Sequence, residues 1–340
     1  MAPSPQHVAG SVLEEAILAV LEHAGFATLT HLGGDITINE RAPPVTIYGR
    51  GASHQIDAVA DPIVAHPFSN PTRLLIEAKA YHPGSRVGLG IVRNAVGTLK
   101  DLSEFWRPAD LAQGAMRRYH YRYAIFATTQ FTKPAQEYAY AHDLHLLPLR
   151  RSAFFRPIVA AIDQLRTALE AGRDLWPRGR SLSSYRQRLR EALRNRRNVD
   201  ARELVPVVEA VASVRAGLIA MVERQFPLFL VPRRIAILDT LRDVERVRIF
   251  WDPAGWYLRR SGDSENLFSF DLPDELFALY ANGGGLRQEA ALRLKVERLA
   301  AIQAFYVRSG STRLVQFQLD HGWIELLRDG GGRRKNGSGT

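Results

Sequence analysis

The chain has no cysteine, only three methionines and no apolar run approaching a membrane span. The absence of cysteine excludes a disulfide framework, a thiolate zinc site and a cysteine nucleophile, and it agrees with the reducing cytoplasm that we expect as its location. Because no stretch of about 18 uncharged apolar residues occurs, no helix is expected to span a membrane. Glu14 and Glu15 interrupt the first apolar stretch, so we expect no signal peptide.

Acidic residues are too few to balance the basic ones. Lysine and arginine number 45 against 35 aspartates and glutamates, which gives a net charge of +10. This excess favours a polyanionic partner, nucleic acid first and an anionic membrane surface second. The length of 340 residues and the 46% hydrophobic content are typical of a globular protein with two domains.

Two carboxylates and a lysine lie on two consecutive predicted strands. Residues 51–59 predict a turn leading into a strand that contains Asp57, and residues 73–79 predict an apolar strand that contains Glu77 and Lys79. The Pro- and Asn-containing stretch between them favours a long hairpin loop. Glu77 and Lys79 share a face because side chains alternate along a strand. If the two strands pair, Asp57 can lie next to Glu77.

Such a set is typical of a metal-dependent phosphodiesterase. Magnesium prefers oxygen ligands and takes one or two carboxylates together with waters and phosphate oxygens. We therefore expect Mg²⁺, for which Mn²⁺ can substitute, on Asp57, Glu77 and the carbonyl of Ala78. Lys79 would hold the attacking water or stabilise negative charge in the transition state. Glu14 is the candidate for a further catalytic carboxylate, with the adjacent Glu15 as the alternative.

In their order along the chain, these residues resemble the PD-(D/E)xK nuclease superfamily, and within it the Mrr-type restriction endonuclease domain. The resemblance covers residues 8–150, and the family's first-helix glutamate, Asp strand and (E/Q)xK strand are similar to Glu14, Asp57 and Glu77-Ala78-Lys79. Two departures stand out. No proline precedes Asp57, and Glu77 stands where many Mrr-type domains have glutamine. The glutamate restores the general acidic motif and argues against an inactive site.

The resemblance implies a restriction-endonuclease-like α/β fold with a mixed central sheet flanked by helices, dependence on a divalent metal, and DNA as the substrate. It also implies a role in restriction–modification or antiviral defence. A homodimer is plausible because one such site cuts one strand and a double-strand break needs two. Two alternatives stay open: a catalytically inactive nucleic-acid-binding protein on a nuclease fold, and a repair or RNA-directed nuclease.

Two further segments are candidates for contact with nucleic acid. Gly88 and Gly90 precede a predicted helix whose first N–H groups could receive a phosphate, and Arg93 projects from the start of that helix. Residues 178–197 contain eight arginines and one glutamate. Within this stretch Arg186 and Arg190 are predicted to pair with phosphates, although a simply solvated helix explains the charge equally well.

Composition and periodicity divide the chain into four parts. We predict an α/β nuclease domain at 8–150, a helical basic linker at 151–199, an α+β domain for recognition or oligomerisation at 200–328, and a disordered tail at 329–340. The first helix is expected over 10–24, with Ser11 as its N-cap and Gly25 at its end. In the C-terminal part the pattern predicts helices over 204–222 and 289–306, a hairpin over 247–260, and two strands within 314–327.

Overall fold

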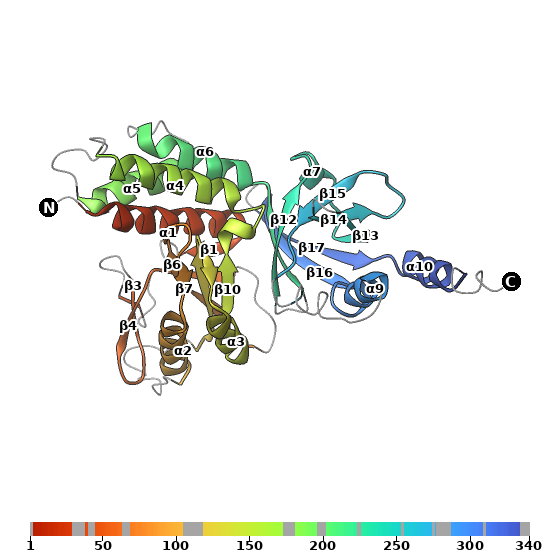
Figure 1. Ribbon diagram of the computed structural model, residues 1–340, viewed down its shortest axis with the longest axis horizontal. Coiled ribbons are helices and arrows are strands. Elements are labelled where there is room, and N and C mark those ends of the chain that lie inside the picture. The colour runs from red at the N-terminus through yellow and green to blue at the C-terminus, as the bar shows by residue number, and fades with distance from the viewer. Residues whose placement is uncertain are drawn as a thin grey trace. The chain divides into compact units, whose positions relative to one another are not determined.

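The computed structural model describes residues 3–28, 38–39, 45–62, 69–104, 118–172, 181–195, 202–222, 226–252, 255–273, 276, 287–308 and 311–333. The chain divides into two compact units, Met1–Arg215 and Ala216–Thr340 (Figure 1). This division differs from the predicted boundary near residue 200, because the helix that follows residue 204 packs within unit 1. Among the described helices, none has the length and apolar character needed to cross a bilayer.

Unit 1 is built around a five-stranded mixed sheet with the strand order β1-β5-β6-β8-β10. Its strands are β1 (Phe26–Thr28), β5 (Ala58–Pro62), β6 (Thr72–Lys79), β8 (His120–Ala127) and β10 (His145–Pro148). β5 is antiparallel to both of its neighbours, whereas β8 is parallel to β6 and β10. The predicted pairing of the Asp57 strand with the Glu77 strand is therefore confirmed.

Two smaller sheets accompany the central one. A three-stranded antiparallel sheet contains β2 (Ile38–Asn39), β3 (Val45–Tyr48) and β4 (Ser53–Ile56), and a two-stranded parallel sheet contains β7 (Arg86–Val87) and β9 (Gln130–Phe131). The chain passes from β4 directly into β5, so one continuous segment links the small sheet to the central sheet. Asp57 is the single residue between these two strands.

Helices cover both faces of the central sheet (Figure 1). They are α1 (Pro5–His23), α2 (Leu89–Ser103), α3 (Lys133–Ala141), α4 (Arg156–Glu170), α5 (Leu182–Asn195) and α6 (Val205–Val214), with short 3₁₀ turns η2 (Leu149–Arg151) and η3 (Arg202–Leu204). The helix α1 packs on β1, β5 and β6, and α4, α5 and α6 pack on α1. The helices α2 and α3 lie on the other side of the sheet.

The start of α1 lies earlier than the sequence pattern predicted. Ser4 is the N-cap, and its hydroxyl accepts from the N–H of His7, while Pro5 occupies the first turn, where its missing N–H costs nothing. Ser11 is therefore an interior, buried residue of the helix. The end was predicted correctly, since Gly25 has a φ of 87°, which glycine adopts readily.

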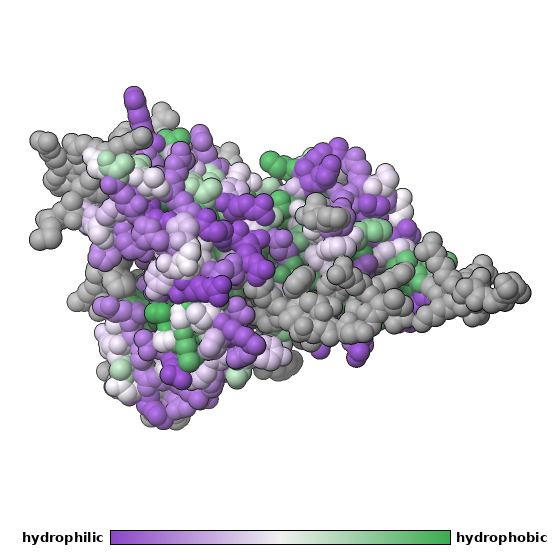
Figure 2. All heavy atoms as spheres, viewed as in Figure 1, coloured by the Kyte–Doolittle hydropathy of each residue, from purple (hydrophilic) through white to green (hydrophobic). Residues whose placement is uncertain are grey.

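The predicted basic linker is an integral part of unit 1. Both α4 and α5 bury an apolar stripe, which in α5 consists of Tyr185, Leu189, Ala192 and Leu193. The helix α6 completes this layer with Val207 and Val211, both fully buried. Figure 2 shows mostly hydrophilic residues on the visible face of the layer, as expected for amphipathic helices that turn their apolar stripes inward.

Unit 2 is a closed seven-stranded barrel with the order β11-β12-β15-β14-β13-β17-β16. The strands are β11 (Leu218–Val222), β12 (Phe226–Pro232), β13 (Val244–Asp252), β14 (Gly255–Arg260), β15 (Asn266–Phe270), β16 (Ala301–Arg308) and β17 (Ser311–Leu319). Inward-facing residues such as Leu230, Ile249 and Phe317 form its core. Helices α7 (Ile237–Thr240), α9 (Arg287–Glu297) and α10 (His321–Arg333) accompany the strands.

Four predictions for the C-terminal part need correction. The predicted helix 204–222 ends as α6 and continues as the strand β11, and the predicted helix 289–306 ends as α9 and continues as β16. The second strand predicted within 314–327 is the helix α10, because Asp320 caps it by accepting from the N–H of Trp323. Residues 329–333 of the predicted tail belong to α10, and 334–340 lie outside the described residues. The hairpin β13–β14 is confirmed.

Candidate functional site

The candidate site forms where β5 and β6 diverge at one end of the central sheet. The register pairs Ala58 with Ile76, so the next opposite positions are Asp57 and Glu77. Directly opposite residues of antiparallel strands point to the same face. The Asp57 side chain turns toward β6, and its Oδ2 accepts the N–H of Ala78 at 2.8 Å. This hydrogen bond fixes the carboxylate beside the strand that carries the other two predicted residues.

Glu77 and Lys79 point to one face of β6 and form an ion pair. The Nζ of Lys79 lies 2.6 Å from Oε1 of Glu77, and each side chain is about one-fifth exposed, at 21% and 22%. The other oxygen of Glu77, Oε2, accepts the phenolic O–H of Tyr123 on β8 at 2.6 Å. The structure thus brings Asp57, Glu77 and Lys79 together, as the sequence predicted, at a position that solvent reaches.

Glu14 and Glu15 on α1 have different surroundings. Glu14 is electrostatically coupled to Asp57 and Lys79 as well as to Arg186 of α5. Glu15 is only 1% exposed, and the guanidinium groups of Arg186 and Arg190 hold it at 3.1 and 2.7 Å. Both glutamates therefore pair with α5, and Glu14 also interacts electrostatically with Asp57 and Lys79.

Burial and neighbouring charges together set the protonation of the site. Burial raises the pKa of Glu14 to about 7, and the charge of Arg186 offsets only part of that effect. Burial also raises the pKa of Asp57, although the Ala78 N–H and the ammonium of Lys79 act against it. For Lys79, burial favours the neutral amine, but the charge and hydrogen bond of Glu77 outweigh it and raise the pKa. Lys79 therefore remains a cation at neutral pH.

The two arginines that were predicted to contact nucleic acid turn inward. Nη2 of Arg186 lies 2.8 Å from Oε2 of Glu14, and its side chain is 13% exposed. Arg190 donates from Nε and Nη2 to both oxygens of Glu15, at 2.8 and 2.7 Å. Both guanidinium groups thus have partners within the chain, and contact of Arg186 and Arg190 with phosphate stays a prediction. The two arginines neutralise the charge of buried glutamates on α1. The number of charged residues in α5 alone does not reveal these partners.

The glycines before α2 and Arg93 lie apart from this ion-pair network. Gly88 is the N-cap residue and Gly90 lies in the first turn of α2, and an added Cβ at either would meet no atom within 4 Å. Close packing within the chain therefore does not require glycine there. Arg93 is exposed, and its guanidinium lies 5.8 Å from the ring centroid of Tyr138. Contact of these three residues with nucleic acid stays a prediction.

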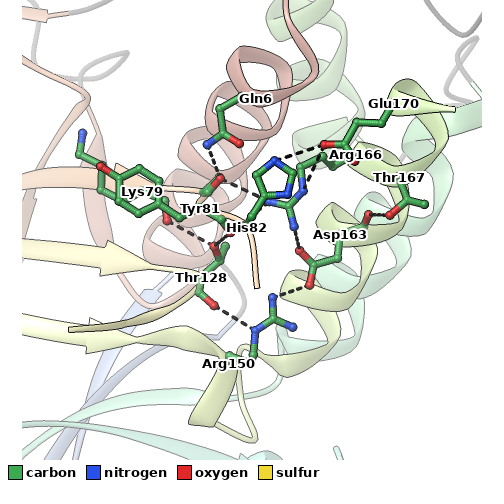
Figure 3. Close-up of polar contacts among 11 residues, drawn as sticks. Gln6, Lys79, Tyr81, His82, Thr128, Arg150, Asp163, Arg166, Thr167 and Glu170 are labelled. Carbon is green, nitrogen blue, oxygen red and sulfur yellow. Dashed lines mark hydrogen bonds and ion pairs between the residues drawn. The ribbon is translucent and has the colours of Figure 1, made fainter. Parts of the chain in front are cut away.

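The chain that leaves Lys79 is anchored by a buried polar network (Figure 3). Arg166 of α4 donates from Nη1 to the carbonyl of Tyr81 at 3.0 Å, and Thr128 Oγ1 donates to the same carbonyl at 2.9 Å. The N–H of Thr128 donates to the carbonyl of Lys79 at 2.9 Å. Asp163 holds both Arg166 and Arg150. The backbone that follows Lys79 is thus held by α4 and by Thr128, which comes directly after β8.

Sequence reasoning missed Tyr123 and the inward role of Arg186. Tyr123 lies in the buried strand β8, and its hydroxyl needs a partner because burial of an unpaired polar group is costly. That requirement was the available signal, since a tyrosine within a buried strand next to an acidic strand end has few other acceptors. For Arg186 the signal was the matching set of glutamates on the first helix.

The donor atoms at the site suit a small hard cation. Across the ranges that the structure describes, no three His, Asp or Glu side chains are grouped as a ready metal site. Magnesium needs fewer, since it usually takes one or two carboxylates and keeps waters and phosphate oxygens. In a strand the N–H and C=O of one residue point the same way, so the Ala78 carbonyl lies on the side of Asp57. Each oxygen of Glu77 also retains a lone pair beyond its present contact.

Comparison with known proteins leaves the chain without an assigned family. No family model matches it, and no curated protein matches it. One similar solved structure is a protein of unknown function, AF1548, with 16% identity over 60% of this chain and 98% of that one, at a TM-score of 0.30. Another is the DNA modification-dependent restriction endonuclease AspBHI, with 15% identity over 51% of this chain, 41% of that one and a TM-score of 0.23. Likenesses this low assign neither fold nor activity.

Proposed function

We propose that this protein is a metal-dependent nuclease that hydrolyses phosphodiester bonds of DNA. The observation that carries the proposal is the meeting of two carboxylates and a protonated lysine at one end of the sheet. Asp57 Oδ2 accepts a hydrogen bond from the N–H of Ala78 at 2.8 Å, and Nζ of Lys79 forms an ion pair with Oε1 of Glu77 at 2.6 Å. Residues of these types, held on a rigid sheet and reached by solvent, supply what phosphoryl chemistry requires.

Each side chain would have a defined task. Asp57, Glu77 and the Ala78 carbonyl would hold Mg²⁺ or Mn²⁺, which when bound activates water and neutralises charge on the phosphate. Lys79 would place its ammonium against the charge that develops on the phosphate oxygens. Tyr123 fixes the Glu77 carboxylate through Oε2. Glu14, with its pKa of about 7, is suited to accept a proton from water near neutral pH.

DNA is the substrate that we propose, for two reasons. The net charge of +10 favours a polyanion, and the order of motifs resembles DNA-cutting enzymes of the Mrr type. We accordingly propose restriction or defence against foreign DNA as the biological role, with two copies of the chain cooperating in a double-strand break.

A plasmid-cleavage assay tests the proposal. Supercoiled DNA would be incubated with the full chain and Mg²⁺, Mn²⁺ or EDTA, and nicked product would be followed over time. We expect nicking only with metal, and a loss of about 10²–10³-fold in rate for Asp57→Ala and for Lys79→Ala. The matched control is Lys133→Ala, since Lys133 also faces a glutamate, Glu137, but is 86% exposed and lies on α3.

The outcomes separate the alternatives. Nicking that survives in both site variants would refute the site, and tight DNA binding without metal-dependent nicking would favour a non-catalytic nucleic-acid-binding protein. Comparing methylated DNA, unmethylated DNA, branched DNA and RNA as substrates would then distinguish a restriction enzyme from a repair or RNA-directed nuclease.

A further inference from the structure

A ladder of ion pairs joins α5 to α1. Arg186, Arg190 and Arg194 are spaced four residues apart, so they lie along one face of α5. Three glutamates on α1 form ion pairs with these arginines, namely Glu14, Glu15 and Glu22. Arg186 contacts two of these, with Nη2 2.8 Å from Glu14 Oε2 and Nε 3.1 Å from Glu15 Oε1.

Only one end of this ladder is coupled to the candidate site. The charge of Arg186 acts on Asp57 as well as on Glu14. Arg194 binds Glu22, about two helical turns further along α1, through Nε at 3.1 Å and Nη2 at 2.5 Å. The same helix pair therefore offers two ion pairs of one chemistry, one that interacts with the site and one further along α1, where Glu22 also accepts from the hydroxyl of Thr28.

The guanidinium of Arg186 is held in place from both sides. Arg190 binds Glu15 through two hydrogen bonds, and Glu15 in turn accepts from Nε of Arg186 at 3.1 Å. The remaining Nη2 then has a fixed direction, toward Glu14. An arginine suits such a bridge because its donors form a rigid planar fork, whereas a lysine would present a single point charge.

We propose that Arg186 is a positioning residue of the nuclease site, which orients the Glu14 carboxylate toward Asp57 and Lys79. This inference rests on the proposed function. It gives Arg186 of α5 a role in the catalytic unit. Because a misplacement of about 1 Å can cost about 10²-fold in rate, loss of the Arg186 bridge is expected to affect turnover more than binding.

The test compares Arg186→Gln with the matched control Arg194→Gln. We expect kcat for plasmid nicking to fall about 10–10²-fold in Arg186→Gln with KM within about twofold of the wild type. Arg194→Gln should keep kcat and KM within about twofold of the wild type while losing a similar amount of stability in urea unfolding. Glu15 keeps its two bonds to Arg190 in the Arg186 variant, which favours folding. If that variant does not fold, Arg186→Lys takes its place.

A double-mutant cycle shows whether Arg186 acts through Glu14. In the Glu14→Gln background, the Arg186 substitution should cause no further loss of kcat. Independent, multiplying losses would overturn the inference, as would equal kcat values for the Arg186 and Arg194 variants. A wild-type protein that nicks no DNA with either metal would instead overturn the proposed function, and the inference with it.

Discussion

Tyr123 and Lys79 each hold one oxygen of the Glu77 carboxylate, so the orientation of Glu77 depends on both. We predict that Tyr123→Phe, which removes only the hydroxyl, lowers the nicking rate about tenfold, because a hydrogen bond to a charged group contributes about 1.5–3 kcal/mol. Steady-state nicking kinetics would measure this. Tyr257→Phe is the matched control, since that phenol bonds Asp252 in unit 2. Equal rates for the two variants would contradict a role for Tyr123 in the site.

The raised pKa of Glu14 makes the free energy of unfolding depend on pH. Its ordinary pKa is near 4.5, and burial raises it to about 7 in the folded chain. Between these values the folded state holds the proton more tightly than the unfolded state, so the free energy of unfolding falls as pH rises, by at most about 1.4 kcal/mol per pH unit. Above pH 7 this contribution is constant.

Urea unfolding between pH 4 and 8 tests this prediction. The wild type should lose stability relative to Glu14→Gln as pH rises from about 4.5 to about 7. The amide does not titrate, so the difference between the two curves isolates the carboxyl group. Parallel curves over this interval would show that the pKa of Glu14 is not raised by folding.

At the level of single residues, the sequence was informative where the partners are close along the chain. Glu77 and Lys79 lie on β6, where strand alternation alone predicts that they share a face, and Asp57 directly precedes β5, the strand that pairs with β6. Tyr123 lies 46 positions from its partner Glu77, and Arg186 lies 171 positions from Glu15. The local sequence pattern does not predict such pairings, because they form only when the sheet and the helical layer pack together.

Among the elements, the hairpin β3–β4 depends on α2 for its position. Asp101 of α2 accepts from the N–H groups of Gly51 and Ala52, at 2.8 and 3.2 Å, and bonds His54 Nε2 at 2.7 Å. Gly49 is required beside it, since a Cβ there would lie 2.0 Å from the Asp101 carboxylate. The Asp101 carboxylate thus links the turn of the β3–β4 hairpin to α2. The second strand of this hairpin, β4, leads directly into Asp57.

We predict that Asp101→Ala loosens this hairpin. Losing hydrogen bonds to three donors should cost about 1–3 kcal/mol and should speed hydrogen exchange in residues 45–56. The nearby pair Arg50–Glu104 joins the same two elements, but it is more than half exposed on both sides, so Glu104→Ala should cost less than about 1 kcal/mol. Similar losses in the two variants, measured by urea unfolding and hydrogen exchange, would contradict the assignment.

Elements with one uniform pattern were predicted well, and those with two adjoining patterns were not. The strand β6 and the hairpin β13–β14 have apolar or turn-bounded sequences. In contrast, only Gly217 marks the junction of α6 with β11, and between α9 and β16 no glycine or proline marks the change. Closure of the barrel makes the second part of each segment a strand, because β11 and β16 pair with each other.

On the scale of the whole molecule, charge and composition favoured one class of partner but did not predict the boundary between the units. The net charge of +10 suggested free basic surfaces, yet Arg186, Arg190 and Arg194 are paired with glutamates inside unit 1. The predicted division near residue 200 followed the end of the basic stretch. The structural division follows the packing of α6 on α1, α4 and α5 instead, and falls after Arg215.

Two truncated chains distinguish these boundaries. Residues 1–215 retain α6 and should unfold cooperatively, whereas residues 1–199 lack Leu204, Val207 and Val211, which are fully buried in unit 1. Each such side chain contributes about 1.5–3 kcal/mol when buried, so the shorter chain is expected to lose most of the typical stability of a domain of this size. Thermal and urea unfolding followed by circular dichroism would measure this. Equal stability of the two chains would place α6 outside the core of unit 1, and metal-dependent nicking by 1–215 alone would assign the catalytic machinery to that unit.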